Sequence, residues 1–155
     1  MDALRTELSN LLRGGQAYDP FESVVAAFKP NERCEIPAGA EHSPWQILEH
    51  MRFSQRDILD FSQNKPGAYP EKVWPDDYWP KDAAPKPGEW DSAIKEFQAG
   101  IEEFERLMND PTRDLNAKFP WGSGQTLLRE ILVAADHAAY HLGQLVELKR
   151  WIDAK

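Results

Sequence analysis

Apolar residues recur every three to four positions over most of this chain, which is the spacing of amphipathic helices. The pattern predicts helices over residues 4–12, after Pro20, and over about 43–64, 90–109 and 126–152. No segment shows the alternation of apolar and polar residues that a half-buried strand requires. The chain is therefore expected to be all-α, and a four-helix bundle is the simplest way to bury these faces against one another.

The helix expected over 43–64 has a clear beginning and end. Ser43 offers a side-chain oxygen to the free amides of the first turn, and Pro44 fits the first helical position. The sequence Asn64-Lys65-Pro66-Gly67 predicts its end, because proline and glycine interrupt a helix. The inner face of this helix is expected to carry Ile47, Leu48, Met51, Ile58, Leu59 and Phe61.

Residues 65–89 form a long loop that is rich in proline and aromatic residues, between this helix and the next. Repeated prolines exclude a regular helix or a central strand. Disordered segments are poor in aromatic residues, so Trp74, Tyr78 and Trp79 predict a packed loop. Together with Trp45, these three residues either line a cleft or anchor the loop and the core.

The bulk properties of the 155-residue chain fit one domain, and residues 1–155 are interpreted as a single unit. The formal net charge is -8, from 18 basic and 26 acidic residues. An acidic surface repels phosphate backbones, and no stripe of Lys and Arg offsets the repulsion. Nucleic acid is therefore not expected as a partner, whereas a small-molecule substrate is expected.

Three further features favour a cytoplasmic protein. The start, Met1-Asp2-Ala3-Leu4-Arg5, lacks the basic residues and apolar run of a secretory signal. No run of about 18 apolar residues is present, so no membrane span is expected. Cys34 is the single cysteine, which excludes an internal disulfide and fits a reducing compartment.

The four histidines are the candidates for chemistry. His137 and His141 stand four residues apart in the last helix, so their rings project from one face and can share a metal ion. His141 is the one polar residue in a stripe that predicts an inward-facing ring: Leu127, Ile131, Ala134, Ala138, His141, Leu145, Leu148 and Ile152. The stripe through His137 is mixed, which places that ring where the core meets a cleft.

His50 also lies on a largely apolar face, so a bundle that packs the two helices together can bring it to the other pair. Three neutral imidazoles would hold one divalent ion and leave a position for water or substrate. Ligand type alone does not distinguish Zn, Ni or Fe. The alternative is a pair of hydrogen-bonded structural histidines. His42 precedes the helix in a loop and is not expected to be a ligand.

Residues beside the three histidines are candidates for an outer shell. Gln144 lies one turn beyond His141 and can orient a ring nitrogen or a ligand. Glu49 and Asp136 adjoin the expected ligands, although both can equally be solvated helix charges. The motif from His137 to His141 lacks the Glu that a zinc peptidase of the HExxH type uses as its base, so that activity is excluded.

Three segments carry a resemblance to a known family. Ser43-Pro44-Trp45-Gln46-Ile47-Leu48-Glu49-His50-Met51 and Asp136-His137-Ala138-Ala139-Tyr140-His141-Leu142-Gly143-Gln144 resemble helices of the DinB-like (DinB/YfiT) superfamily. The segment Trp74-Pro75-Asp76-Asp77-Tyr78-Trp79-Pro80 resembles one branch of it. The resemblance implies an up-down-down-up bundle, often dimeric, with a metal ion on His50, His137 and His141. It also implies small-thiol S-transferases and a mycothiol-dependent isomerase among the relatives.

Several functions remain open on the sequence. One is a metal-dependent enzyme, either a transferase that uses a low-molecular-weight thiol or a hydrolase. A second is a non-catalytic metal-binding or small-molecule-binding stress-response protein. A third is a purely structural metal, which three protein ligands disfavour because structural zinc sites usually have four. A homodimer is expected from two apolar faces, Leu4-Leu8-Leu11 and Phe97-Ile101-Phe104.

Overall fold

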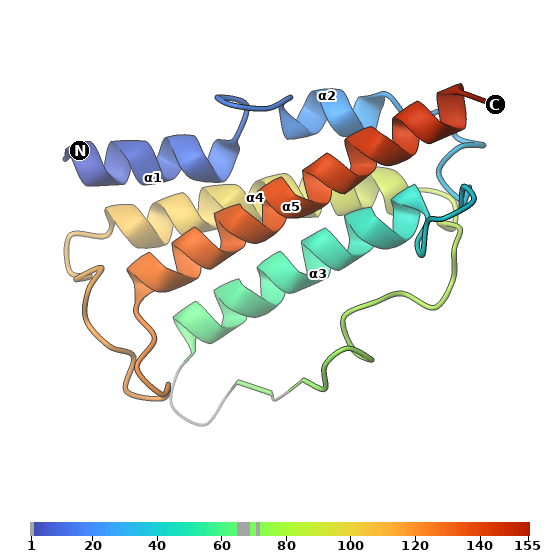
Figure 1. Cartoon of the computed structure of the whole chain (residues 1–155). Helices are drawn as coiled ribbons and strands as arrows, with labels where there is room; N and C mark the ends of the chain where they lie inside the picture. The colour runs from blue at the N-terminus through green and yellow to red at the C-terminus, as the bar shows by residue number, and fades with distance from the viewer. Residues whose placement is uncertain (1, 65–68, 71) are drawn as a thin grey trace.

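The computed structural model describes residues 2–64, 69–70 and 72–155, and every described element of regular structure is a helix, apart from one isolated bridge. Residues 65–68 and 71 of the expected loop, and Met1, lie outside the described part. The main helices run up, down, down and up, as predicted (Figure 1). The helices are α1 (Ala3–Arg13), α2 (Phe21–Ala26), α3 (Pro44–Gln63), α4 (Glu89–Asn109) and α5 (Leu127–Asp153).

The first arm of the bundle is α1 continued by the short α2. The two pieces lie end to end along one side of the bundle (Figure 1). Gly14 and Gly15 separate them with positive φ angles of 66° and 76°, which residues other than glycine rarely adopt. The glycine pair therefore separates the helix expected over 4–12 from the one expected after Pro20, and both are confirmed.

Both helices that carry histidines begin at side-chain caps. Ser43 and Gln46 form a reciprocal capping box at the start of α3, with Pro44 in the first turn. The Thr126 hydroxyl accepts a hydrogen bond from the Arg129 amide at the start of α5. The predicted beginnings of both helices are confirmed.

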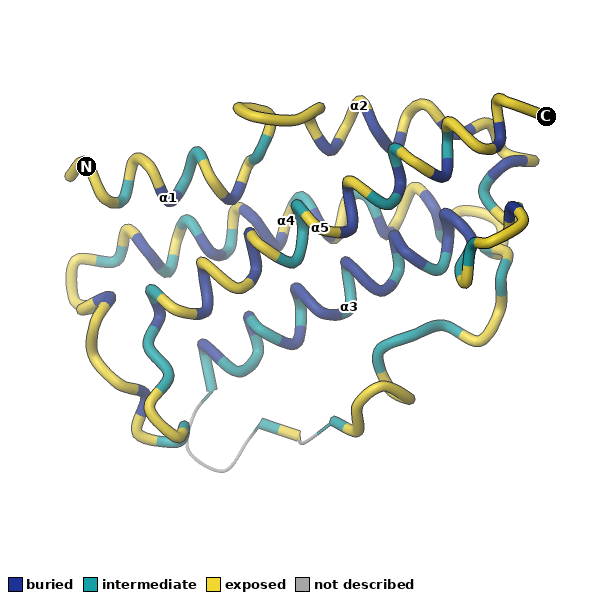
Figure 2. Tube along the Cα trace, viewed as in Figure 1, coloured by how far each residue is buried: buried dark blue, intermediate teal, exposed yellow. Residues whose placement is uncertain are grey.

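Helix α3 packs against both α4 and α5. Its contact with α4 includes ion pairs from Arg52 to Glu96 and from Arg56 to Glu103, while its other side packs on α5. The buried residues of the helices face one another across this interior (Figure 2). Because α3 and α5 run in opposite directions, the first half of α3 lies beside the second half of α5 (Figure 1).

A segment over residues 72–88, named here the return segment, leads back along α3 to the start of α4 (Figure 1). Side chains of α3 and its cap hold its carbonyl groups. The Ser43 hydroxyl donates to the Ala83 carbonyl at 2.6 Å, and the Gln46 amide donates to the Pro80 carbonyl at 3.1 Å. The prediction of a packed loop is therefore confirmed around Tyr78 and Trp79, which lie over the face of α3 that carries His50, whereas residues 73–77 are exposed.

The two faces expected to support a homodimer differ in the structure. Phe97, Ile101 and Phe104 are buried within the bundle, so that expected surface is wrong. Leu4 and Leu11 are exposed, while Leu8 packs into the core. The homodimer itself stays a prediction, which light scattering tests. Among the described residues, no helix combines the length and apolar character needed to cross a membrane.

Candidate metal centre

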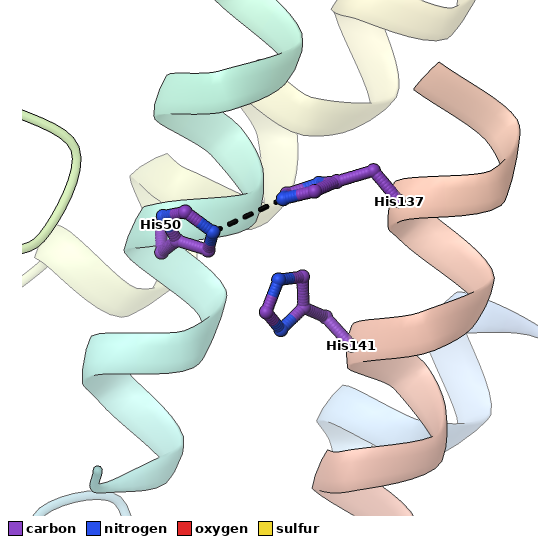
Figure 3. Close-up of side chains that lie close together, drawn as sticks. All are labelled: His50, His137 and His141. Atoms are coloured by element: carbon purple, nitrogen blue, oxygen red, sulfur yellow. Dashed lines mark hydrogen bonds between the residues drawn. The ribbon is translucent and has the colours of Figure 1, made fainter. Parts of the chain in front are cut away.

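Three histidines converge between α3 and α5. His50 projects from α3 toward His137 and His141, which project from successive turns of α5 (Figure 3). One ring nitrogen from each lies within 4.8 Å of the other two. His50 and His141 are buried, with 1% and 4% of their surface exposed, and His137 is half-buried. The predicted convergence and the inward orientation of His141 are confirmed.

The orientation of His50 depends on the return segment. Its Nδ1 lies 2.9 Å from the carbonyl oxygen of Tyr78. Because a carbonyl oxygen only accepts, Nδ1 carries the proton and donates it. The lone pair of a neutral ring is then on Nε2, and this is the nitrogen that points to the other two histidines (Figure 3).

The orientation of His141 depends on Gln144 in the same helix. The Nδ1 of His141 donates to the Gln144 side-chain oxygen at 2.7 Å. This hydrogen bond leaves the lone pair on Nε2, as the Tyr78 carbonyl does for His50. The predicted role of Gln144 in orienting a ring nitrogen is therefore confirmed.

His137 completes the cluster through its own Nε2, which lies 3.0 Å from the Nε2 of His50 (Figure 3). Since His50 Nε2 has no proton in the neutral ring, His137 donates this hydrogen bond. If the His137 proton moved from Nε2 to Nδ1, the Nε2 atoms of His50 and His137 would both have free lone pairs. The Nε2 lone pairs of all three rings would then point toward the centre of the cluster, where a cation could bind.

The electrostatic environment keeps these rings neutral. Burial lowers the pKa of His137 to about 3, helped by the neighbouring His141 and His50. Burial also lowers the pKa of His141 to about 4, against the raising effect of the Gln144 hydrogen bond. The pKa of His50 is lowered by burial as well. Imidazole binds a metal through its neutral form, so all three are available near neutral pH.

The donor set fits a divalent transition metal. Two nitrogens bound about 2.0–2.1 Å from a tetrahedral zinc ion lie roughly 3.3–3.4 Å apart. The 3.0 Å between His50 and His137 is within a few tenths of an ångström of this spacing, and the other ring nitrogens, all within 4.8 Å of one another, would have to move closer together around the ion. Three imidazole nitrogens suit Zn, Ni, Fe and Cu alike, so the residues could hold a metal ion without selecting one.

Trp79, which the sequence left open as a cleft-lining or anchoring residue, forms a wall of the cluster. Its ring stacks on His50 at 3.8 Å between centroids and on His42 at 3.9 Å. Two imidazoles stacked this closely cannot share one face of an indole, so they lie on opposite faces. His42 is therefore separated from the cluster by Trp79, in agreement with the expectation that it is not a ligand.

A buried carboxylate holds the return segment in place. Asp57 lies two turns beyond His50 on the same face of α3, and 8% of its surface is exposed. It accepts hydrogen bonds from the phenols of Tyr69 and Tyr78, each at 2.6 Å, and Lys72 lies 3.4 Å away. Burial and the nearby carboxylate raise the pKa of Tyr78 to about 12, so the phenol keeps its proton. Asp57 thus fixes the residue whose carbonyl orients His50.

Sequence reasoning missed this arrangement, although a signal was present. Polar residues at 43, 46, 50, 54 and 57 recur at helical spacing along the otherwise apolar inner side of α3. Buried polar groups require partners, so such a row predicts an irregular segment lying over it. In the structure, four of these residues bind the backbone or the phenols of residues 69–83.

The remaining candidates take other roles. Glu49 pairs with Arg52 of the next turn rather than with a histidine, and Asp136 is exposed on α5. Trp45 is buried in the core, and it borders a small pocket beside the start of α4 rather than the histidine cluster. Trp74 is 65% exposed, although its ring centroid lies 6.2 Å from that of His50. Cys34 is exposed and free of any disulfide.

Comparison with known proteins agrees with this architecture. A family model described as the DinB superfamily matches residues 14–145, which include all three histidines. Neither the curated proteins nor the solved structures yield a match.

Proposed function

The chain belongs to the DinB superfamily, and from its histidine cluster we propose that it binds one divalent metal ion through His50, His137 and His141. We further propose that the bound ion serves a reaction on a small molecule. That reaction is either the transfer of a low-molecular-weight thiol to an electrophile or a hydrolysis.

One observation carries this proposal: the two most buried rings are each locked with Nε2 toward the cluster. A carbonyl and an amide oxygen, on Tyr78 and Gln144, hold the Nδ1 protons of His50 and His141. Ligating histidines in metalloproteins are commonly held through their other ring nitrogen in the same way. Histidines with a purely structural role would not need the Nε2 atoms of two different rings to point toward the same place.

A bound divalent ion would lower the pKa of a coordinated thiol or water and so supply a nucleophile near neutral pH. The protein's own residues would prepare the surroundings. Trp79 and the return segment shield the α3 side from water, while the half-buried His137 marks the side open to solvent. Tyr78 and Asp57 keep the shielding segment in position.

The second candidate is a non-catalytic protein that binds a metal or a small molecule. It is favoured by the composition of the cluster, which in the described part of the chain consists of histidines alone. A carboxylate or cysteine among them would have marked a proton acceptor or a nucleophile. The two candidates differ in turnover, not in metal binding.

Turnover is the experiment that separates them. Protein purified without a histidine tag is analysed for metal and loaded with Zn, Ni or Fe. It is then assayed with a model aryl halide and several small thiols, and separately with a model ester. Thiol consumption or ester hydrolysis that a chelator removes supports the enzyme. A metal-loaded protein inactive over the whole panel supports the binding protein.

Loss of the Gln144 acceptor tests the proposed orientation of His141. Gln144→Leu is expected to lower metal affinity about 10- to 100-fold, as for other partners of ligating histidines. Gln144→Glu keeps an acceptor oxygen and is the matched control, which should bind at least as tightly as the natural chain. Isothermal titration with Zn²⁺ measures both. Equal affinities for Leu and Glu would show that the hydrogen bond does not prepare the ligand.

A further inference from the structure

A groove of about 670 Å³ lies beside the histidine cluster, between residues 39–42 and the second half of α5. None of the three histidines lines it, but its walls contact them. Gln144 binds His141 at 2.7 Å, and the Tyr140 ring centroid lies 4.9 Å from that of His141. His42 also lines it and is separated from His50 by Trp79, which stacks on both rings. A molecule in this groove would therefore lie on the Nδ1 side of His141, one imidazole ring away from a metal bound at Nε2.

Gly143 supplies an independent reason to regard the groove as a binding site. It stands in the middle of α5, where glycine costs about 1 kcal/mol relative to alanine. A Cβ built on Gly143 would meet no atom within 4 Å, so packing inside the chain does not require glycine. The residue lies on the floor of the groove, where the missing side chain lets another molecule approach the helix backbone.

The walls of the groove define the chemistry of its occupant. Tyr140 and Trp151 are exposed aromatic rings, and Ile47 and Leu148 supply apolar surface. The charged lining residues are the carboxylates Glu41 and Glu147, and no Lys or Arg lines the groove in the described part of the chain. Arg150 pairs with Glu147 from outside the lining. Aromatic rings and carboxylates favour cations and neutral apolar groups, and they repel anions.

We propose that this groove binds the organic substrate of the histidine centre, and that the substrate is a neutral or cationic molecule with an aromatic or similarly apolar body. An anionic substrate or an anionic thiol would not be accepted there. This inference rests on the proposed function for its link to chemistry, because the groove has no reactive group of its own. The binding preference itself does not require that the metal be present.

The test uses three probes of one shape and different charge: benzylamine, benzyl alcohol and benzoate. Each is titrated into the full-length, isotope-labelled protein while the Gly143 amide and the Trp151 indole signals are followed by NMR. Benzylamine and benzyl alcohol should shift both signals, and benzoate should bind on the order of tenfold more weakly than benzylamine, a difference of about 1.4 kcal/mol. Benzoate binding as tightly as benzylamine would overturn the proposal.

Two variants of Gly143 provide the control. Gly143→Ala should raise the melting temperature, because the added methyl group meets nothing and improves the helix. Gly143→Leu should remove benzylamine binding, followed at the Trp151 indole, and leave Zn²⁺ affinity unchanged. Unchanged benzylamine binding in Gly143→Leu would contradict the proposal. So would a second copy of the chain in the groove, seen as concentration-dependent shifts of Trp151 without any probe.

The same titrations separate the two proposals. If the natural chain binds benzylamine but no Zn²⁺, the metal centre fails while the groove stands. If it binds Zn²⁺ through the histidines but none of the probes, the groove fails while the metal centre stands.

Discussion

Replacing His141 with alanine is expected to lower the affinity for a divalent ion by more than about 100-fold. Loss of an outer partner of a ligating histidine already costs about 10- to 100-fold, and loss of the ligand itself must cost more. Gln144, in the same helix, fixes the orientation of the His141 ring. Without His141, only the two nitrogens of His50 and His137 remain as metal ligands. Titration of the metal-free protein with Zn²⁺, Ni²⁺ and Co²⁺ measures the effect.

The matched control is His42→Ala. His42 is also a histidine near the site, but Trp79 separates it from the cluster. This variant should still bind one ion per chain. Circular dichroism of both variants shows whether they keep their helices. A folded His141→Ala protein that bound the ion as tightly as the natural chain would exclude His141 as a ligand.

Saturating metal is expected to raise the melting temperature by about 8–16 °C. A ligand that binds only the folded state at 1,000 times its dissociation constant adds about 4 kcal/mol to the free energy of unfolding. For a domain of this size, each kcal/mol raises the melting temperature by roughly 2–4 °C. The proposed ligands come from α3 and α5, so unfolding separates them. Differential scanning calorimetry with and without Zn²⁺ measures the shift.

The metal-free protein should still unfold in one cooperative transition, because the core does not depend on the ion. Buried residues of α3, α4 and α5, such as Met51, Phe104 and Leu145, pack without any contribution from a metal. The temperature shift should disappear in His137→Ala. A metal-free chain without a cooperative transition would instead indicate the structural role for the metal. An equal shift in His137→Ala would place the stabilising ion elsewhere.

Much of the fold and the position of the cluster could be predicted from periodicity. The apolar stripe of α5 predicted an inward-facing His141, and the spacing of four residues placed His137 beside it. His50 followed from the apolar face of α3 and from the family resemblance. The structure brings its Nε2 to within 3.0 Å of His137. Helices follow local rules, so residues on one face of a helix can be assigned without coordinates.

The contacts of the return segment could not be predicted in the same way. The Tyr78 carbonyl meets His50 across 28 residues of sequence, and a backbone carbonyl has no side-chain signature. The stacking of Trp79 on His50 likewise depends on the path of an irregular, proline-rich chain. That path is held by hydrogen bonds that Ser43 and Gln46 donate and that Asp57 accepts. The positions of these residues in the sequence show only that some partner is required.

Surface assignments were less reliable for a related reason. A helix face that is apolar in sequence does not show which neighbour covers it. Phe97, Ile101 and Phe104 are covered by the bundle itself, whereas Leu4 and Leu11 on α1 are not. Whether such a face is buried depends on how many helices pack against it, and only the assembled fold shows that number.

Anomalous diffraction from crystals of the metal-loaded protein, collected at the absorption edge of the added metal, would locate the ion itself. One strong peak is expected between α3 and α5, about 2.0–2.2 Å from the Nε2 atoms of His50, His137 and His141. A peak that lies away from this cluster, or an ion held by the α5 pair while the His50 ring points elsewhere, would contradict the proposed metal site.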